Sequence, residues 1–305
     1  MKNITATDTV AERPTAVALG IFDGVHLGHR SIFDKVKEYE KQGLSPAVFT
    51  FKTESISVKH GKKYSYIYTS NTKMKIFESM GIEYVYAPDF SQLKGLSCEE
   101  FVRDILVKKM NASAVVCGPK FRFGKGAAGG VDELFAMGKK YGFDVGYVEP
   151  VYIDNSVVSS SAVKEFLSRS DIAGAERFLG HGYTIEGKVC EGNRIGRTID
   201  FPTINQYFDK NQLIPQYGVY SSVTYIDGRE YLSVTNIGVK PTVDSSGIPL
   251  AETHILGYSG NLYDKEMTVR LTEYIRGECR FSSVDELKKQ IKADVQKVKT
   301  TGVIK

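Results

Sequence analysis

The chain has 305 residues, of which 42% are hydrophobic and 25% are charged, as in a soluble globular protein large enough for two domains. Its 40 basic and 36 acidic residues leave a formal net charge of +4, too small to indicate a nucleic-acid or membrane surface. The opening segment lacks the apolar core of a secretory signal, and no apolar run approaches the ~18 residues of a membrane-spanning helix. Cys98, Cys117, Cys190 and Cys279 are scattered, so we expect free thiols and a cytoplasmic location.

The first half of the chain alternates short apolar runs with amphipathic segments. The first run, TAVALG at 15–20, is almost continuously apolar, as expected of a parallel strand that is buried on both faces. This alternation predicts a doubly wound α/β sheet. The predicted strands are 15–20, 46–51, 83–87, 113–117 and 143–149, and the predicted helices are 29–42, 70–80, 97–109 and 131–141.

After residue 183, strand-like runs follow one another without a long helix between them. In 266–274, apolar and polar residues alternate with the period of a half-buried antiparallel strand. Similar runs at 183–190, 218–226, 230–237 and 251–258 predict a small all-β barrel, followed by an amphipathic helix at 283–299. The predicted domains are 1–168 and 183–305, joined by a short helical linker at 169–182.

The decapeptide GIFDGVHLGH at 20–29 stands between the first strand and the helix that follows it. Its glycines allow the backbone to turn sharply near a phosphate, and the new helix directs its N-terminal N–H groups toward it. His26 and His29 lie three residues apart and can hydrogen-bond phosphoryl oxygens as negative charge develops there. This turn is the first candidate active site.

The decapeptide resembles the nucleotidyltransferase superfamily, whose H-x-G-H signature is matched by His26, Gly28 and His29, and its FAD synthetase branch in particular. The resemblance implies that the phosphate of FMN attacks the α-phosphate of ATP and that pyrophosphate leaves. Both histidines, magnesium (Mg2+) and basic groups would stabilise the transition state, and the anionic nucleophile needs no strong general base. The residues implied on the ATP side are Gly20, Phe22, Asp23, Gly24, His26, His29, Ser159, Ser160, Ser161 and Lys164.

The serine run Ser159–Ser160–Ser161 with Lys164 corresponds to the second signature of the same superfamily. Its hydroxyls would hold the triphosphate at the start of a helix. Without the resemblance, three serines are equally an ordinary helix N-cap. The residues implied on the flavin side are Lys120, Phe121, Phe123 and Gly124.

The N-terminal half departs from the FAD synthetase pattern at three places. The family usually has Asp-Pro-His-Pro after the second strand, where this chain has Lys-Thr-Glu-Ser at 52–55. Lys120 stands where the family has Asp or Asn, and Lys164 where it has Arg, which keeps the charge but loses the planar guanidinium. Each change touches the expected substrate surface, so loss of adenylyl transfer remains an alternative.

The barrel begins with a loop rich in glycine and basic residues, followed by Phe-Pro-Thr-Ile-Asn at 201–205. Such a loop suits a flap over phosphates, although many basic hairpin loops are simply solvated. Thr203 and Asn205 are two residues apart on a strand, so both can face one magnesium ion. Glu252 lies in the middle of a later strand, where a carboxylate is either a candidate general base or an edge residue facing water.

The motifs GKV, FPTIN, GVY, NIGVKPT, ETHIL and IRGE, in this order, are similar to riboflavin kinase along nearly all of 183–295. The resemblance implies a six-stranded barrel that transfers the γ-phosphoryl group of ATP to the 5′-hydroxyl of riboflavin, with magnesium. It assigns Thr203 and Asn205 to the metal and phosphates, Glu252 to the base, and Arg276 with the C-terminal helix to the flavin. The residues implied on the ATP side are Gly187, Lys188, Gly196, Arg197, Thr203 and Asn205.

Together the motifs follow the order of the bacterial bifunctional riboflavin kinase/FAD synthetase family. The expected ligands are riboflavin, FMN, FAD and ATP, with no nucleic acid or membrane partner, in a monomer or weak oligomer. Two alternatives stay open: a riboflavin kinase with a degenerate N-terminal domain, and a flavin-binding regulator without turnover.

Overall fold

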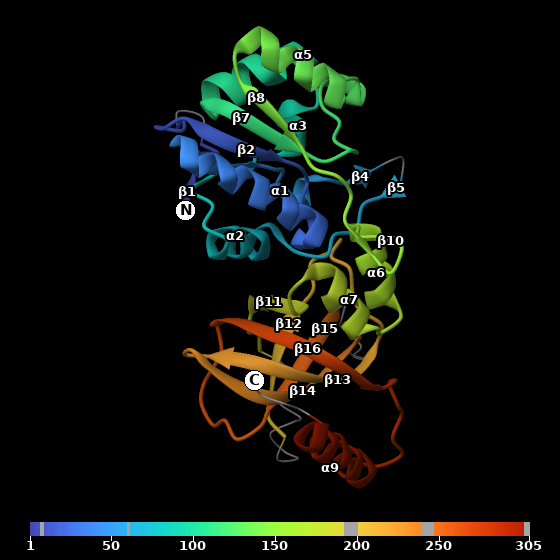
Figure 1. Cartoon of the computed structure of the whole chain (residues 1–305). Coiled ribbons are helices and arrows are strands. Elements are labelled where there is room, and N and C mark those ends of the chain that lie inside the picture. The colour runs from blue at the N-terminus through green and yellow to red at the C-terminus, as the bar shows by residue number, and fades with distance from the viewer. Residues whose placement is uncertain (7–8, 60–61, 192–200, 240–246, 302–305) are drawn as a thin grey trace. The chain divides into compact units, whose positions relative to one another are not determined.

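A computed structural model describes residues 1–6, 9–59, 62–191, 201–239 and 247–301. The chain forms two compact units, Met1–Ser160 and Ser161–Lys305. Figure 1 colours the chain from blue at the N-terminus to red at the C-terminus.

The first unit is built on a six-stranded sheet in which every neighbouring pair is parallel. In spatial order its strands are β1 (Lys2–Asn3), β6 (Tyr84–Tyr86), β3 (Ser45–Phe49), β2 (Thr15–Leu19), β7 (Ala112–Cys117) and β8 (Asp144–Tyr147). The chain proceeds from β2 outward through β3 to β6, and then crosses back to β7 on the other side of β2. The strand order therefore reverses between β2 and β7, and the predicted doubly wound sheet is confirmed.

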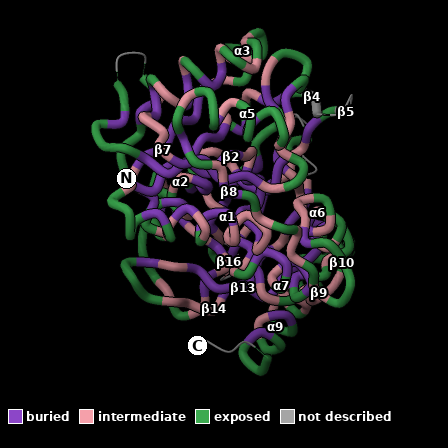
Figure 2. Tube along the Cα trace, turned by 45° about the horizontal axis from the view of Figure 1, so that its top comes forward, coloured by how far each residue is buried: buried purple, intermediate pink, exposed green. Residues whose placement is uncertain are grey.

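Helices cover both faces of this sheet. Ala16 and Ala18 of β2 point toward α1 (Leu27–Glu38) and α2 (Ser70–Ser79). Val17 and Leu19 pack on the other face in the same cluster as residues of η4 (Phe101–Lys109, a π-helix) and α5 (Val131–Tyr141). All of β2 is buried, as Figure 2 shows for the centre of this unit. A strand with apolar partners on both faces has no polar side, which explains its continuous apolar sequence.

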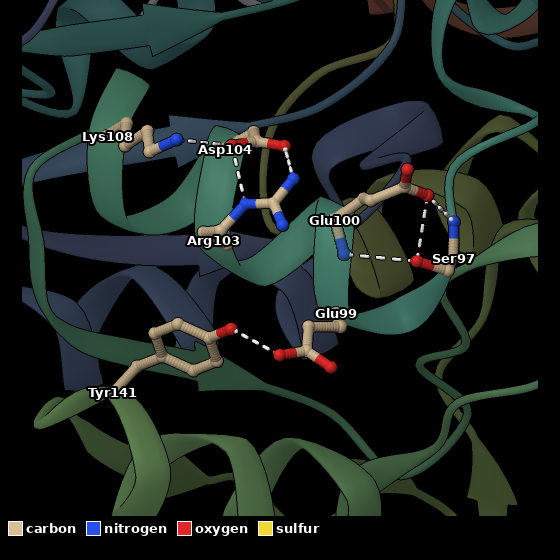
Figure 3. Close-up of polar contacts among 7 residues, drawn as sticks. All are labelled: Ser97, Glu99, Glu100, Arg103, Asp104, Lys108 and Tyr141. Atoms are coloured by element: carbon tan, nitrogen blue, oxygen red, sulfur yellow. Dashed lines mark hydrogen bonds and ion pairs between the residues drawn. The ribbon is translucent and has the colours of Figure 1, made fainter.

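A short helix, α4 (Cys98–Glu100), leads directly into η4, and a capping box starts it. The Ser97 hydroxyl accepts from the Glu100 backbone N–H at 3.2 Å, and the Glu100 carboxylate accepts from the Ser97 backbone N–H at 2.8 Å (Figure 3). Glu99 then accepts a 2.8 Å hydrogen bond from the hydroxyl of Tyr141, at the end of α5. These contacts hold the two helices of one layer together.

Several short elements of the first unit carried no sequence signal. They are η1 (Asp23–Val25), η2 (Tyr39–Gln42), η3 (Thr53–Ser55), the pair β4 (Val58–Lys59) and β5 (Lys62–Lys63), α3 (Phe90–Leu93), η5 (Lys125–Ala127), and the pair β9 (Tyr152–Ile153) and β10 (Ser156–Val157).

The second unit is an antiparallel barrel with the sheet order β11-β16-β13-β14-β15-β12. The strands are β11 (Thr184–Lys188), β12 (Thr203–Tyr207), β13 (Gly218–Ile226), β14 (Arg229–Val239), β15 (Pro249–Ile255) and β16 (Glu266–Arg276). The strands at the two ends of this order, β11 and β12, nearly close the barrel. The Cys190 backbone N–H, which follows β11, donates to the Asn205 carbonyl of β12 at 2.9 Å. The buried Gln206 amide also bridges the Gly187 and Met267 carbonyls, at 3.0 and 2.9 Å. The predicted barrel is confirmed.

In the described part of this unit, the helices are α6 (Ser160–Ser168), α7 (Ile172–Leu179) and α9 (Val284–Thr301). The helix α7 ends at Gly180, whose φ of 73° is the left-handed conformation of a helix C-cap. The helix α9 contributes Val295 and Val298 to a cluster with Val219 and Val234 of the barrel. The predicted C-terminal helix is confirmed, whereas the boundaries 1–168, 169–182 and 183–305 stay a prediction about independent folding.

Candidate active sites

The loop after β2 carries unusual backbone conformations. Phe22, Gly24 and Val25 have φ values of 54°, 80° and 45°. Only Gly24 adopts such angles without cost, and a β-branched residue at positive φ is a strained outlier. Strain of this kind persists only where the surrounding structure enforces it, and it concentrates at functional sites. The Gly20 backbone also needs its glycine, because a Cβ there would lie 2.9 Å from the Phe22 ring.

The two histidines of the loop lie against each other at the start of α1. His26 is the N-cap of this helix and is only 6% exposed. Its ring stacks on that of His29, with 3.5 Å between ring centroids and 18° between planes. The Phe22 ring holds His29 from the side, edge-on at 5.2 Å. Both imidazoles are thus positioned at a helix N-terminus, where the helix dipole favours an anion.

Asp23 is held within the fold of this loop. Its side chain is 2% exposed, and its Oδ1 accepts a 2.7 Å hydrogen bond from the Ile67 backbone N–H. The Ser160 hydroxyl donates to the Asp23 carbonyl at 2.9 Å. The structure therefore brings the start of the serine run onto the histidine loop, although the two are far apart in the sequence. Ser159 is half-buried, whereas Ser161 and Lys164 are placed by α6 in the second unit.

The predicted flavin-side residues follow β7, at the carboxyl end of the strand that lies beside β2. This is the point where the strand order reverses, and open α/β sheets bind ligands at such a point. Lys120 is exposed and Phe121 is partly buried. Phe123 is 6% exposed and packs on Phe101 at 5.5 Å, so it belongs to the core of the unit. Gly124 has a φ of 76°, and a Cβ there would lie 2.6 Å from the Cys98 Sγ.

The Lys-Thr-Glu-Ser segment that replaces the usual family motif is tied into the fold. The Glu54 carboxylate accepts hydrogen bonds from the Ser70 backbone N–H at 2.7 Å and the Ser70 hydroxyl at 2.6 Å, at the start of α2. Lys52 lies 3.5 Å from the Asp89 carboxylate. The loop at 52–55 is therefore held by hydrogen bonds from Ser70 and by an ion pair with Asp89, both in the same unit.

Sequence reasoning missed Lys73, a fully buried lysine of α2. Its ammonium donates at 2.9 Å to the carbonyl of Ile21, two residues after the end of β2. One signal was available: Lys73 is four residues before the buried Phe77, so it lies on the apolar stripe of a predicted helix.

In the barrel, Glu252 of β15 is paired on both sides with an asparagine. The antiparallel register places Asn205 of β12 opposite Glu252, and Asn236 of β14 opposite Glu252 on the other side. Directly opposed residues project from the same face of a sheet, with Cβ atoms about 5 Å apart. Asn205 is buried, and Glu252 is partly buried. The carboxylate therefore lies within a polar row across neighbouring strands, not at an edge facing water.

Thr203 lies two residues before Asn205 on the same face of β12, and it is directly opposite His254 of β15. The His254 ring approaches the Pro202 carbonyl with its Nδ1 at 2.9 Å, and packs edge-on against Phe201 at 5.3 Å. These contacts hold the start of β12, and thereby set the position of Thr203 and Asn205.

The phosphate side of the predicted kinase site is only partly described. Lys188 forms a 2.8 Å ion pair with Asp264, and this carboxylate raises the pKa of Lys188. Both side chains are more than half exposed, so the pair contributes little to stability and can exchange partners. A Cβ at Gly187 would meet open space. Gly196 and Arg197 lie outside the described residues.

Arg276, predicted to border the flavin, is bound by the C-terminal helix. Its guanidinium makes a bidentate contact with Asp294 of α9, at 3.0 Å from Nε to Oδ1 and 2.8 Å from Nη2 to Oδ2. The Gln290 amide donates to the same carboxylate at 3.0 Å. The Asp294 side chain is 4% exposed, so this ion pair fastens α9 to the end of β16.

Comparison with known proteins assigns a family to each half of the chain. The model of FAD synthetase matches residues 8–162, and the model of riboflavin kinase matches residues 179–301. The chain is 33% identical to the bifunctional riboflavin kinase/FMN adenylyltransferase of Escherichia coli K12 over 301 residues, covering 96% of each chain. It is 32% identical to the protein of the same name from Buchnera aphidicola (Schizaphis graminum), covering 93% of each chain.

A solved structure described as a macrolide-efflux protein from Streptococcus pneumoniae is similar along the whole chain. It superposes with a TM-score of 0.82 and 28% sequence identity, covering 98% of both chains. In the part of this chain that the structure describes, no helix is both long and apolar enough to cross a membrane.

The parallel α/β unit with its histidine loop and the barrel with its Glu–Asn row match, in turn, the FAD synthetase and riboflavin kinase models, which together define a two-domain enzyme of flavin-cofactor synthesis. Both domain families are present, in the predicted order. The chain belongs to the bifunctional riboflavin kinase/FMN adenylyltransferase family.

Proposed function

We propose that the chain phosphorylates riboflavin to FMN in its C-terminal unit and adenylylates FMN to FAD in its N-terminal unit, using ATP in both reactions. The observation that carries the kinase assignment is the pairing of Glu252 with Asn205 across β15 and β12. The stacked pair of His26 and His29 at the start of α1 supports the adenylyltransferase assignment.

In the kinase reaction, Glu252 would accept the proton of the riboflavin 5′-hydroxyl. That oxygen attacks the γ-phosphorus of ATP, the bond from the γ-phosphorus to the bridging oxygen breaks, and ADP leaves. A half-buried carboxylate suits this role, because few waters compete for the hydroxyl proton. Arg276 and α9 would border the flavin, and Gly187, Lys188, Gly196 and Arg197 would contact the phosphates of ATP.

The residues present fit magnesium in the kinase site. Magnesium usually takes one or two protein oxygens and completes its shell with water and substrate phosphates. Thr203 and Asn205 offer a hydroxyl and an amide oxygen on one face of β12. When bound, the ion would neutralise charge on the β- and γ-phosphates.

In the adenylyl transfer, a phosphate oxygen of FMN would attack the α-phosphorus of ATP, and the bond to the β-phosphate bridging oxygen would break to release pyrophosphate. His26 and His29 would donate hydrogen bonds to the phosphoryl oxygens as charge develops. The serine run Ser159–Ser160–Ser161 and Lys164 would hold the triphosphate, together with the backbone of 20–24. On the flavin side we propose Lys120 and Phe121, while Phe123 in the core and Gly124 beside Cys98 would shape that loop.

A second candidate function is a riboflavin kinase whose N-terminal unit no longer transfers adenylyl groups. The observation that favours it is the position of Glu54, whose carboxylate is engaged by Ser70 in the segment that departs from the family motif. A flavin-binding regulator without turnover is disfavoured by the presence of Thr203, Asn205 and Glu252 in one constellation. We further propose that the protein is a cytoplasmic monomer or weak oligomer without nucleic-acid or membrane partners.

One assay separates these functions. Purified protein is incubated with riboflavin, ATP and magnesium, and the flavins are separated chromatographically over time. FMN followed by FAD supports the bifunctional enzyme, FMN alone supports the kinase, and unchanged riboflavin refutes both.

A further inference from the structure

The buried lysine of the N-terminal unit contacts the ends of two neighbouring strands. The Lys73 ammonium donates to the Ile21 carbonyl at 2.9 Å, the Phe51 carbonyl at 3.3 Å and the Thr50 hydroxyl oxygen at 3.4 Å. Thr50 in turn donates its hydroxyl proton to the same Ile21 carbonyl at 2.9 Å. Ile21 directly precedes the strained turn at Phe22, so the lysine fixes the backbone from which the histidine loop departs.

These contacts lie at the carboxyl edge of the sheet. Ile21 follows β2, and Thr50 and Phe51 follow β3, which pairs with β2 in parallel. In an open α/β sheet, this edge is where substrates bind. Lys73 is therefore placed beneath the loops that would carry the nucleotide, and its position on α2 connects both loops to one rigid helix.

Burying an ammonium group in this position is costly. Burial lowers the pKa of Lys73 to about 8, although the nearby Asp23 and Glu54 carboxylates act in the opposite direction and raise it. Tyr64 also faces Asp23, and its pKa is raised by burial and then by that carboxylate. An apolar side chain of similar length would fill the space without this cost. The charge at this buried position therefore indicates a task beyond packing.

We propose that Lys73 is a positioning residue for adenylyl transfer: it fixes the backbone on both sides of the nucleotide loop and places a buried positive charge beneath the bound triphosphate. This inference rests on the proposed adenylyltransferase function of the N-terminal unit. Lys73 touches no substrate itself, and it acts through the Ile21–Gly24 backbone and the histidines that this backbone carries.

The test compares Lys73→Met, Lys73→Arg and Lys75→Met in the full chain. Lys75 lies on the exposed side of the same helix and is the matched control. The kcat and KM for ATP are measured for FAD formation, while FMN formation in the same sample serves as an internal standard.

Lys73→Met should lower kcat/KM for ATP in FAD formation by roughly 10- to 100-fold, as displacement of a reacting group does. Lys75→Met should leave it unchanged, and FMN formation should stay within about twofold in all variants.

A pH profile distinguishes positioning by charge from simple packing. Because the pKa of Lys73 is about 8, the wild-type kcat/KM for FAD formation should fall as pH rises from 7 to 9 and the ammonium loses its proton. Lys73→Arg should remain flat over this range, since a guanidinium keeps its charge. If Lys73→Met does not fold, as judged by thermal unfolding, the comparison of the wild-type and Lys73→Arg profiles decides the outcome.

Three results would overturn the inference while the proposed function stands. They are wild-type kinetics in a folded Lys73→Met protein, a wild-type profile without a decline between pH 7 and 9, and the same decline in Lys73→Arg as in the wild type. A wild-type protein that forms FMN but no FAD would instead refute the adenylyltransferase function, and the inference with it.

Discussion

Glu252 lies directly opposite Asn205 in the antiparallel pairing of β15 with β12. The two residues are 47 positions apart in the chain, yet their side chains project from one face of the barrel. A carboxylate and an amide in this arrangement can hold a hydroxyl nucleophile next to a metal-bound phosphate. The geometry thus connects the proposed proton acceptor, Glu252, and the proposed phosphate ligand, Asn205, through two paired strands.

The first prediction concerns Glu252. Glu252→Gln keeps the shape of the side chain and removes its ability to accept a proton, so FMN formation should fall by roughly 10²- to 10⁴-fold. Glu273→Gln, at an exposed position of β16, is the control and should retain wild-type activity. The initial rate of FMN formation is measured at saturating ATP. A wild-type rate in Glu252→Gln would remove this residue from the mechanism.

A second prediction separates the two active sites. His29→Ala removes one of the stacked imidazoles at the N-terminus of α1, so FAD formation should be abolished. FMN formation should persist, because Glu252 and Asn205 belong to the other compact unit. Both products are quantified from one reaction that starts with riboflavin. Equal loss of FMN and FAD would show that the histidine acts on folding of the whole chain.

The ion pair between Arg276 and Asp294 leads to a third prediction. Asp294→Ala leaves a partly buried guanidinium without its carboxylate, and breaking such a pair costs about 3–5 kcal/mol. The barrel should therefore unfold at lower denaturant concentration. The KM for riboflavin should rise, since α9 and Arg276 would border the flavin. Asp285→Ala, exposed in the first turn of α9, is the control. Unchanged unfolding of Asp294→Ala would show that α9 needs no such fastening.

The fourth prediction concerns which fragments fold. A fragment of residues 180–305 should fold and make FMN but no FAD, and a fragment of 161–305 should be more stable. The longer fragment retains α6 and α7, in which Leu167 and Phe178 are buried. Each buried apolar side chain of this size contributes about 1.5–3 kcal/mol. Thermal unfolding of both fragments, followed by circular dichroism, tests the difference. An unfolded 180–305 fragment would place the domain boundary before α6.

The main elements could be predicted because their apolar periodicity reports burial directly. The strand β2 is apolar throughout since both faces are covered, and β16 alternates since one face is buried. Polar residues carry no such local signal. The Asp23 carboxylate accepts from the Ile67 backbone N–H, 44 positions away, and no local pattern indicates that contact. The positive φ at Val25 was equally hidden, because nothing in a valine indicates a left-handed turn.

The last prediction concerns Lys120, an exposed cation in the loop after β7 where the FAD synthetase pattern has an acidic or amide residue. A positive charge there either attracts the phosphate of FMN or repels the magnesium that accompanies ATP. We predict that repulsion dominates, because Lys120 lies at the strand-order reversal beside the loop that would bind the triphosphate. The wild-type protein should then form FAD slowly, and Lys120→Asp should increase that rate.

The matched control for this substitution is Lys125→Asp, which makes the same change of charge a few residues further along the chain. FAD formation from FMN is measured at several magnesium concentrations. If Lys120 repels the ion, the gain from Lys120→Asp is largest at low magnesium, because added salt and metal screen the repulsion. A lower FAD rate in Lys120→Asp would show that the cation attracts the FMN phosphate instead. A wild-type FAD rate equal to the kinase rate, with no gain from the substitution, would exclude the repulsion.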